Sequence, residues 1–232
     1  MHDNGIETVC VVGAGTMGTQ IALQCALHGL QMWLHDVRPE QLDRALASAR
    51  AHLERRVQRG ALGAADLAAA LARVHPTPAL AEAAAQAELV VEAVPEDRTL
   101  KQQVFQELHR LCPAHTLLTS NSSSIPIAEL TATLPLERQG RCANLHLFNP
   151  PLVLRLVEVV CGPHTSEATL QQLLAFVRRI DREPVVLRRA ITGFIVNRLL
   201  WALVREALWL AEQGYATPLD IDTAVRLGLN HP

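Results

Sequence analysis

The chain has 232 residues, of which 49% are hydrophobic and 19% charged, and its formal net charge is −2. This composition is that of a folded globular protein with a buried core, and it excludes a disordered chain. The near-zero net charge argues against nucleic acid or an anionic membrane surface as the main partner.

The first 120 residues alternate short apolar runs with segments of helical periodicity. Strands are expected over 6–12, 31–36, 73–76, 89–92 and 117–120, and helices over 16–28, 39–59 and 97–111. This alternation is typical of a parallel sheet covered by helices on both faces. The expected fold class is therefore α/β, with a Rossmann-like, mostly parallel sheet.

The pattern changes after residue 121. Two strands, 143–148 and 152–160, are expected on either side of a tight Asn149-Pro150-Pro151 turn, and a helix over 166–180 and a strand over 184–187 follow. Beyond residue 189 only helical segments are expected, over 193–213 and 218–227. We therefore predict an α/β domain over 1–189 and a short, all-helical second domain over 190–232.

Three features bear on the location of the chain. The N-terminal residues lack the basic region of a signal peptide and lead directly into a strand. The most apolar later stretch, 191–210, contains Arg198, Arg205 and Glu206, so we expect no membrane span. The five cysteines are scattered without a C-x-x-C pair, and we expect buried free thiols, a cytoplasmic location and no metal site.

A glycine-rich motif follows the first predicted strand. The run V-C-V-V-G-A-G-T-M-G contains G-x-G-x-x-G and opens the first predicted helix. Gly13 permits a tight turn, Gly15 lets the backbone approach a pyrophosphate, and Gly18 allows close packing of the helix on the sheet. The helix N-terminus, with Thr16 and Met17, offers free N–H groups and partial positive charge to a pyrophosphate. The motif predicts a dinucleotide site.

Asp36 indicates which dinucleotide binds. It ends the second predicted strand, 23 residues after Gly13. A carboxylate there accepts hydrogen bonds from the ribose hydroxyls and repels a 2′-phosphate, so NAD is predicted rather than NADP. The alternative is a surface aspartate that caps the next helix.

Polar residues gather in further segments. These read S-N-S-S-S at 120–124, H-L-F-N-P at 146–150, L-V-E-V-V at 156–160 and G-F-I-V-N-R at 193–198. Together with the glycine motif, they follow the order of the L-3-hydroxyacyl-CoA dehydrogenase family. The chain resembles this family over essentially its whole length.

The resemblance implies roles for four residues in the reaction. His146 matches the catalytic histidine of the family and Glu158 its acidic partner. Ser123 matches a serine that hydrogen-bonds the reacting oxygen, and Asn197 matches a helix-start asparagine that helps to hold the substrate.

The resemblance also implies binding roles. Glu96, Lys101 and Asn149 match positions that line the nicotinamide half of the cofactor. Arg59 falls near a basic position that contacts the CoA portion of the substrate. Lys101 is also the single lysine of a chain that otherwise uses arginine, although a surface lysine on a helix is the ordinary alternative.

The chemistry of the histidine can be argued from the residues alone. Oxidation of a secondary alcohol requires a base for the hydroxyl proton, and a neutral histidine suits this task near neutral pH. A carboxylate on the other ring nitrogen fixes the tautomer and stabilises the imidazolium. His146 and Glu158 lie on consecutive predicted strands that are expected to be neighbours, so the two side chains could meet.

Structural alternatives accompany each of these residues. His146 is one of ten histidines and could be structural. Glu158 needs a partner inside an apolar strand even without catalysis. The serine loop could be a helix N-cap, and Asn197 could be a helix-surface residue.

The leading hypothesis is an NAD-dependent oxidation of (S)-3-hydroxyacyl-CoA to 3-oxoacyl-CoA, as in fatty acid metabolism. The alternatives are a dehydrogenase of a free hydroxy acid or sugar acid, of the gulonate or carnitine type, and a non-catalytic NAD-binding protein. Two small departures from the family pattern, Leu147 and Thr192, remove no reacting group.

The helical domain of the family usually continues beyond the point where this sequence stops. The apolar residues of the segment 193–213 are therefore left without obvious cover. We expect a homodimer, a complementing partner chain or a shortened chain.

Overall fold

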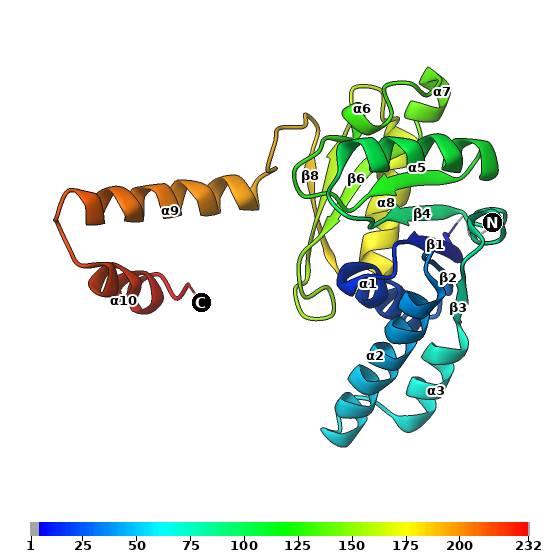
Figure 1. Ribbon diagram of the computed structural model, residues 1–232, viewed down its shortest axis with the longest axis horizontal. Helices are drawn as coiled ribbons and strands as arrows, with labels where there is room; N and C mark the ends of the chain where they lie inside the picture. The colour runs from blue at the N-terminus through cyan, green and yellow to red at the C-terminus, as the bar shows by residue number, and fades with distance from the viewer. Residues whose placement is uncertain (1–4, 232) are drawn as a thin grey trace. The chain divides into compact units, whose positions relative to one another are not determined.

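The structure, a computed structural model, describes residues 5–231. Its internal contacts divide the chain into two compact units, Met1–Thr192 and Gly193–Pro232. The first unit is an α/β domain and the second is a pair of helices (Figure 1).

One eight-stranded sheet forms the centre of the first unit, with strand order β3-β2-β1-β4-β5-β6-β7-β8. Strands β1 to β6 are parallel, whereas β7 runs antiparallel to β6 and β8 runs parallel to β7. The strands are β1 (Thr8–Val12), β2 (Gln31–His35), β3 (Val74–Thr77), β4 (Leu89–Glu92), β5 (Leu117–Ser120), β6 (Cys142–Leu147), β7 (Leu156–Cys161) and β8 (Glu183–Leu187). The predicted mostly parallel α/β fold is confirmed.

Helices cover both faces of the sheet. Successive side chains of a strand point to opposite faces, and both sets of side chains are apolar and need to be buried. Val9 and Val11 of β1 belong to the apolar cluster formed with α1, α2 and α8, whereas Cys10 and Val12 belong to the cluster formed with α5 and α6. The helices of the first unit are α1 (Thr16–Leu27), α2 (Pro39–Gln58), α3 (Ala64–Ala72), α4 (Leu80–Ala84), α5 (Arg98–Leu111), α6 (Ile127–Leu130), α7 (Leu136–Gln139) and α8 (Glu167–Arg179).

The second unit consists of α9 (Val196–Glu212) and α10 (Pro218–Gly228). No residue of either helix is buried. The exposed fractions of Leu199, Trp201 and Leu208 on α9 are 66%, 67% and 58%. In the part of the chain that the structure describes, no helix has the length and apolar character needed to cross a membrane.

Apart from shifts of one or two residues at the ends of several elements, the structure differs from the predicted elements in three respects. The strand predicted over 152–160 begins only at Leu156, because the Asn149-Pro150-Pro151 segment continues into turns up to residue 153 and is not a tight hairpin. The helix predicted from Gly193 begins at Val196, since Gly193 and Phe194 have φ angles of 78° and 47°. Four short helices, α3, α4, α6 and α7, were not predicted.

Candidate functional site: a nucleotide loop and a histidine–glutamate pair on one edge of the sheet

The glycine loop connects β1 to α1, and each of its three glycines has a distinct environment. Gly13 has a φ of +106°, and a Cβ there would lie 2.6 Å from the Ala93 oxygen. A Cβ on Gly18 would lie 1.8 Å from the Gly13 oxygen. A Cβ on Gly15 would meet no atom within 4 Å, so the space in front of Gly15 is open. Two glycines therefore allow the tight turn, and the third leaves room for a ligand.

The start of α1 suits an anion. No side chain caps its N-terminus, so the N–H groups of its first turn, which includes Thr16 and Met17, are left for a ligand. These features fit the pyrophosphate of a dinucleotide.

Asp36 follows β2 and reaches back to this loop. One carboxylate oxygen accepts a hydrogen bond from the Ala14 N–H at 3.1 Å, and the other accepts one from the Arg38 N–H at 3.0 Å. Asp36 thus contacts the residue that precedes α2 as well as the glycine loop. Each oxygen keeps a second lone pair, so the carboxylate can still accept from ribose hydroxyls.

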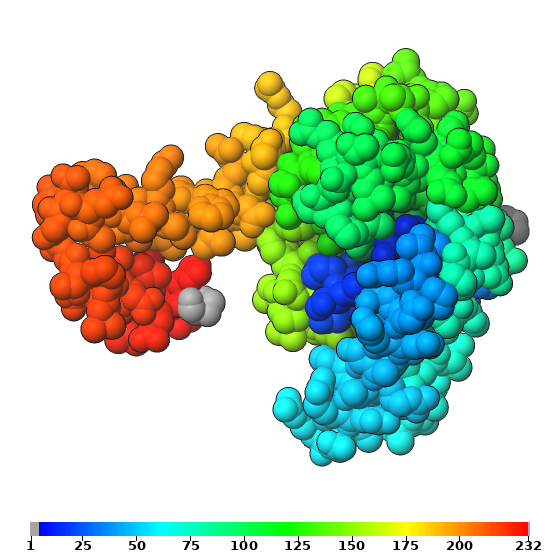
Figure 2. Space-filling view, viewed as in Figure 1, coloured from blue at the N-terminus to red at the C-terminus, as the bar shows by residue number. Residues whose placement is uncertain are grey.

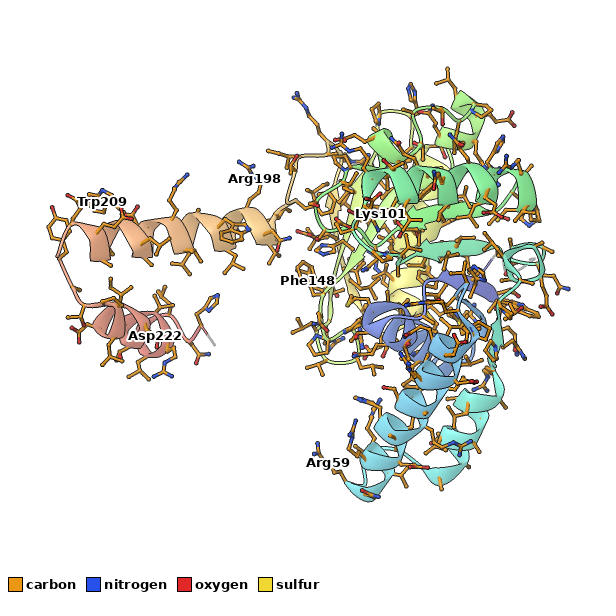
Figure 3. The ribbon with its side chains drawn as sticks, in the orientation of Figure 1. Arg59, Lys101, Phe148, Arg198, Trp209 and Asp222 are labelled. Carbon is orange, nitrogen blue, oxygen red and sulfur yellow. The ribbon has the colours of Figure 1, made fainter. Side chains whose placement is uncertain are left out.

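Lys101 and Glu96 lie where β4 leads into α5. Lys101, on α5 (Figure 3), is only 1% exposed, so it is not a surface lysine. Its ammonium donates to Glu92 Oε1 at 2.7 Å and to the Val94 carbonyl at 3.0 Å, and it lies 3.3 Å from Glu96 Oε2. The three donor positions of the ammonium therefore have three acceptors.

The pKa values of the two glutamates move in opposite directions. Burial raises the pKa of Glu92, against the opposing effect of the Lys101 ammonium and of three hydrogen bonds. Partial burial also acts to raise the pKa of Glu96, but hydrogen bonds from Ser122 and Ser124 and the charge of Lys101 outweigh it and lower that pKa.

The serine loop follows β5 and is held by its own hydroxyl groups. Ser122 Oγ donates to Glu96 at 2.5 Å and accepts from the Ile125 N–H at 2.9 Å, and Ser124 Oγ donates to Glu96 at 2.8 Å. Asn121 Oδ1 accepts from the Leu147 N–H at 2.9 Å, which joins the loop to β6. The Ser123 hydroxyl makes no hydrogen bond to any other residue that the structure describes, so it can serve a ligand.

His146 and Glu158 meet across β6 and β7. The two residues are direct partners in the antiparallel register, and His146 Nδ1 lies 2.8 Å from Glu158 Oε2. Both are buried, with exposed fractions of 6% and 1%. The centroids of the Phe148 and His146 rings lie 4.4 Å apart. With Nδ1–H donating to the carboxylate, Nε2 carries the lone pair of the neutral imidazole. The contact predicted from the strand order is present, and its geometry is that of a base held by an acid.

The residues described so far come to one edge of the sheet. The carboxyl ends of β1, β4, β5 and β6 carry, in turn, the glycine loop, Glu92, the serine loop and His146, and these four strands are parallel neighbours. The strand order reverses between β1 and β4, and ligands of open α/β sheets bind outside the carboxyl ends of the strands at such a point. The edge therefore forms a single candidate site.

In the described part of the first unit, Asn149 and Arg59 make no side-chain hydrogen bond or ion pair with this group. Asn149 is exposed beyond the end of β6. Arg59 is exposed at the end of α2, on the arm that α2 and α3 form (Figures 2 and 3). Asn197 is the second residue of α9 and belongs to the second unit. The roles of these three residues remain predictions.

Glu92 is the functional candidate that the sequence analysis did not assign. It is fully buried at the end of β4, and its carboxylate contacts Lys101, Ser120 and the Val94 N–H. The sequence did contain a signal for it. Glu92 follows three apolar strand residues, and a carboxylate in such a place needs partners, as Glu158 does.

The cysteines and the acidic groups bear on whether a metal ion could bind within the part of the chain that the structure describes. All five cysteines are buried and free, and burial raises the pKa of Cys112 to about 11 and of Cys25 and Cys142 to about 12. Such thiols are unreactive at neutral pH. Among the described residues, no group of three or more histidine, cysteine, aspartate or glutamate side chains could hold a metal ion.

Comparison with known proteins identifies two domains. Residues 8–190 match the family model described as "3-hydroxyacyl-CoA dehydrogenase, NAD binding domain". Residues 193–232 match "3-hydroxyacyl-CoA dehydrogenase, C-terminal domain". Together these matches cover almost the whole chain.

Two curated relatives show the extent of the similarity. A probable 3-hydroxybutyryl-CoA dehydrogenase of Bacillus subtilis is 35% identical over 98% of this chain and 78% of its own length. A 3-hydroxyadipyl-CoA dehydrogenase of Escherichia coli is 40% identical over 98% of this chain, which spans only 47% of that relative. Among solved structures, an (S)-3-hydroxybutyryl-CoA dehydrogenase of Ralstonia eutropha is 33% identical with a TM-score of 0.93, and the match covers 98% of this chain and 79% of that one.

Proposed function

Because the chain belongs to the 3-hydroxyacyl-CoA dehydrogenase family, we propose that it oxidises (S)-3-hydroxyacyl-CoA to 3-oxoacyl-CoA reversibly, with NAD as the cofactor. The observation that carries this proposal is the His146 Nδ1–Glu158 Oε2 contact of 2.8 Å on the same sheet edge as the glycine loop. The histidine–glutamate pair supplies a proton acceptor at the sheet edge where the glycine loop can receive a dinucleotide.

The chemistry divides between cofactor and protein. Bound NAD would supply the hydride acceptor for the carbinol carbon. His146 Nε2 takes the hydroxyl proton, and the Glu158 carboxylate stabilises the resulting imidazolium and keeps its ring oriented. Ser123 and Asn197 donate hydrogen bonds to the oxygen as it becomes a carbonyl. In the reverse direction, the imidazolium returns the proton to that oxygen.

The binding roles divide between the parts of NAD and the substrate. The glycine loop, with Thr16 and Met17, receives the pyrophosphate, and Asp36 receives the adenine ribose. We assign Glu96, Lys101 and Asn149 to the nicotinamide half of NAD. Arg59 is proposed to contact the CoA portion of the substrate.

The substrate class is tested by comparing a thioester with the matching free acid. We expect acetoacetyl-CoA to oxidise NADH in the presence of the protein, whereas free acetoacetate does not. Equal rates with the two compounds would overturn the CoA assignment and favour a free-acid dehydrogenase. NADH binding without turnover of either compound would favour a non-catalytic NAD-binding protein.

We further propose that the protein forms a homodimer through α9. The support is the apolar side chains that this helix exposes, including Leu199, Leu208 and Trp209, which favour self-association. Light scattering at micromolar concentration tests this, and a monomer mass would refute it. The five buried free thiols fit a reducing compartment, so a cytoplasmic location is proposed.

A further inference from the structure

The Glu92 carboxylate connects three segments at the nucleotide edge of the sheet. Oε1 accepts hydrogen bonds from Lys101 Nζ and from the Val94 N–H, each at 2.7 Å, and Oε2 accepts one from Ser120 Oγ at 2.6 Å. The Lys101 ammonium and the Val94 N–H can only donate, and the Ser120 hydroxyl can also donate, so the three contacts suit an ionised carboxylate. Val94 lies after β4, Lys101 on α5 and Ser120 at the end of β5.

The contacts of Glu92 close into a ring. The Lys101 ammonium forms ion pairs with both Glu92 and Glu96, and Glu96 accepts hydrogen bonds from Ser122 and Ser124. The Ser122 N–H in turn donates to Ser120 Oγ at 3.1 Å, which leads back to Glu92. The ring fixes the serine loop to the β4–α5 loop, and both of these segments lie at the candidate nicotinamide position.

Glu92 also lies directly beside the glycine loop. It is the register partner of Val12, the residue before Gly13, across the β1–β4 pair. The next residue, Ala93, donates from its N–H to the Val12 carbonyl at 2.8 Å, and its own carbonyl oxygen lies where a Gly13 side chain would be. The strand order reverses at this point, and dinucleotides bind to open α/β sheets in the crevice at such a point.

We propose that Glu92 is a positioning residue for the nicotinamide half of the cofactor. It is fully buried, and its hydrogen bonds are made to Val94, Lys101 and Ser120. It holds the Lys101 ammonium, the Glu96 carboxylate and the serine loop in the arrangement that receives the dinucleotide. This inference rests on the proposed function only for the identity of the cofactor, because it concerns binding and not the transfer of the proton.

The experiment uses Glu92→Gln, which keeps the shape of the side chain and removes its charge. We expect the Kd for NADH, measured by fluorescence titration, to rise about tenfold, since a buried charge-assisted hydrogen bond is lost. The KM for NAD rises in parallel, whereas the pH midpoint of the kcat profile does not move.

A second pair of variants isolates the Ser120 contact. Thr119 and Ser120 are consecutive, fully buried residues of β5, and each donates a hydroxyl hydrogen bond, to the Val90 carbonyl and to Glu92 respectively. Ser120→Ala is expected to raise the Kd for NADH about threefold, the cost of one hydrogen bond. Thr119→Val, the matched control, also loses a buried hydroxyl but is expected to bind NADH as the unmodified protein does.

Two results would overturn the proposal. One is a folded Glu92→Gln protein with unchanged affinity for NADH. The other is an equal loss of affinity in Ser120→Ala and Thr119→Val, which would indicate a general effect of β5 packing. If Glu92→Gln does not fold, the Ser120–Thr119 comparison decides. No thioester is used in the titration, so a failure of the CoA assignment leaves this test intact.

Discussion

Two buried ion pairs lie along the same sheet edge, and their surroundings differ. In the Glu92–Lys101 pair, the ammonium has three acceptors and the carboxylate three donors. Such a pair holds its charges in place. In the His146–Glu158 pair, the carboxylate accepts from Nδ1, and an imidazole can gain a proton on Nε2 without losing this bond. The first arrangement suits positioning, whereas the second suits proton transfer.

The largest effect is expected when the proton acceptor is removed. His146→Ala should lower kcat by about 10³-fold, within the range for loss of a general base, because no other group replaces Nε2. The Kd for NADH should stay within about twofold of the unmodified value, since the nucleotide contacts are separate. His164→Ala, a change of an exposed histidine, is the control. Activity that survives His146→Ala would remove this pair from the mechanism.

A smaller loss is expected from the acid of the same pair. Glu158→Gln keeps an oxygen near Nδ1 but no longer stabilises the imidazolium, so kcat should fall by about 10²-fold. Glu183→Gln, an exposed carboxylate on the neighbouring strand β8, should have little effect. Steady-state kinetics measures both variants. A Glu158→Gln enzyme with full kcat would show that the carboxylate is structural only.

A change in the positioning pair should affect binding rather than proton transfer. Lys101→Arg keeps the positive charge, but a planar guanidinium cannot direct donors toward three acceptors grouped around one nitrogen. The Kd for NADH should rise about tenfold, and the pH midpoint of kcat should not move. Fluorescence titration and a kcat–pH profile measure the two quantities. A shifted midpoint with unchanged affinity would reverse the roles of the two pairs.

The smallest effect concerns the stability contributed by Glu96. Its pKa in the folded protein lies below the ordinary 4.5, so the ionised form is favoured by folding. This stability is present above pH 4.5 and is lost as the pH falls through the lower, folded-state value. Glu96→Gln should lower Tm by about 1–3 °C at pH 7, because the side chain is partly exposed and screened.

The same variant provides its own check at low pH. The Tm difference between Glu96→Gln and the unmodified protein should shrink as the pH falls through the lowered pKa of Glu96, since both proteins then carry a neutral side chain. Thermal unfolding followed by circular dichroism at several pH values measures this. A difference that grows toward low pH would contradict the direction of the pKa shift.

Much of the fold follows from local sequence patterns. The ends of β4 and β5 were predicted to the residue, because Leu89–Glu92 and Leu117–Ser120 are short apolar runs with clear boundaries. The helices α3 and α4 were missed, because alanine dominates residues 61–87 and gives no contrast between an apolar and a polar face. The loop after Phe148 was predicted too short, since consecutive prolines indicate a turn but not its length.

The site was predictable to the extent that its residues lie next to recognisable patterns. The His146–Glu158 contact follows from two neighbouring strands. The arrangement around Glu92 does not follow in this way, because it joins residues of β4, α5 and the serine loop that are as many as 28 positions apart. The burial of Lys101 has the same origin, since its partners are assembled only by the fold.

The most direct test of the central claim is a crystal structure of the protein with NAD⁺ and acetoacetyl-CoA bound. We predict that the 3-keto oxygen lies about 2.6–3.2 Å from His146 Nε2, within hydrogen-bond reach, with the nicotinamide C4 facing the keto carbon. A keto group bound away from His146, or a dinucleotide bound away from the glycine loop, would contradict the account.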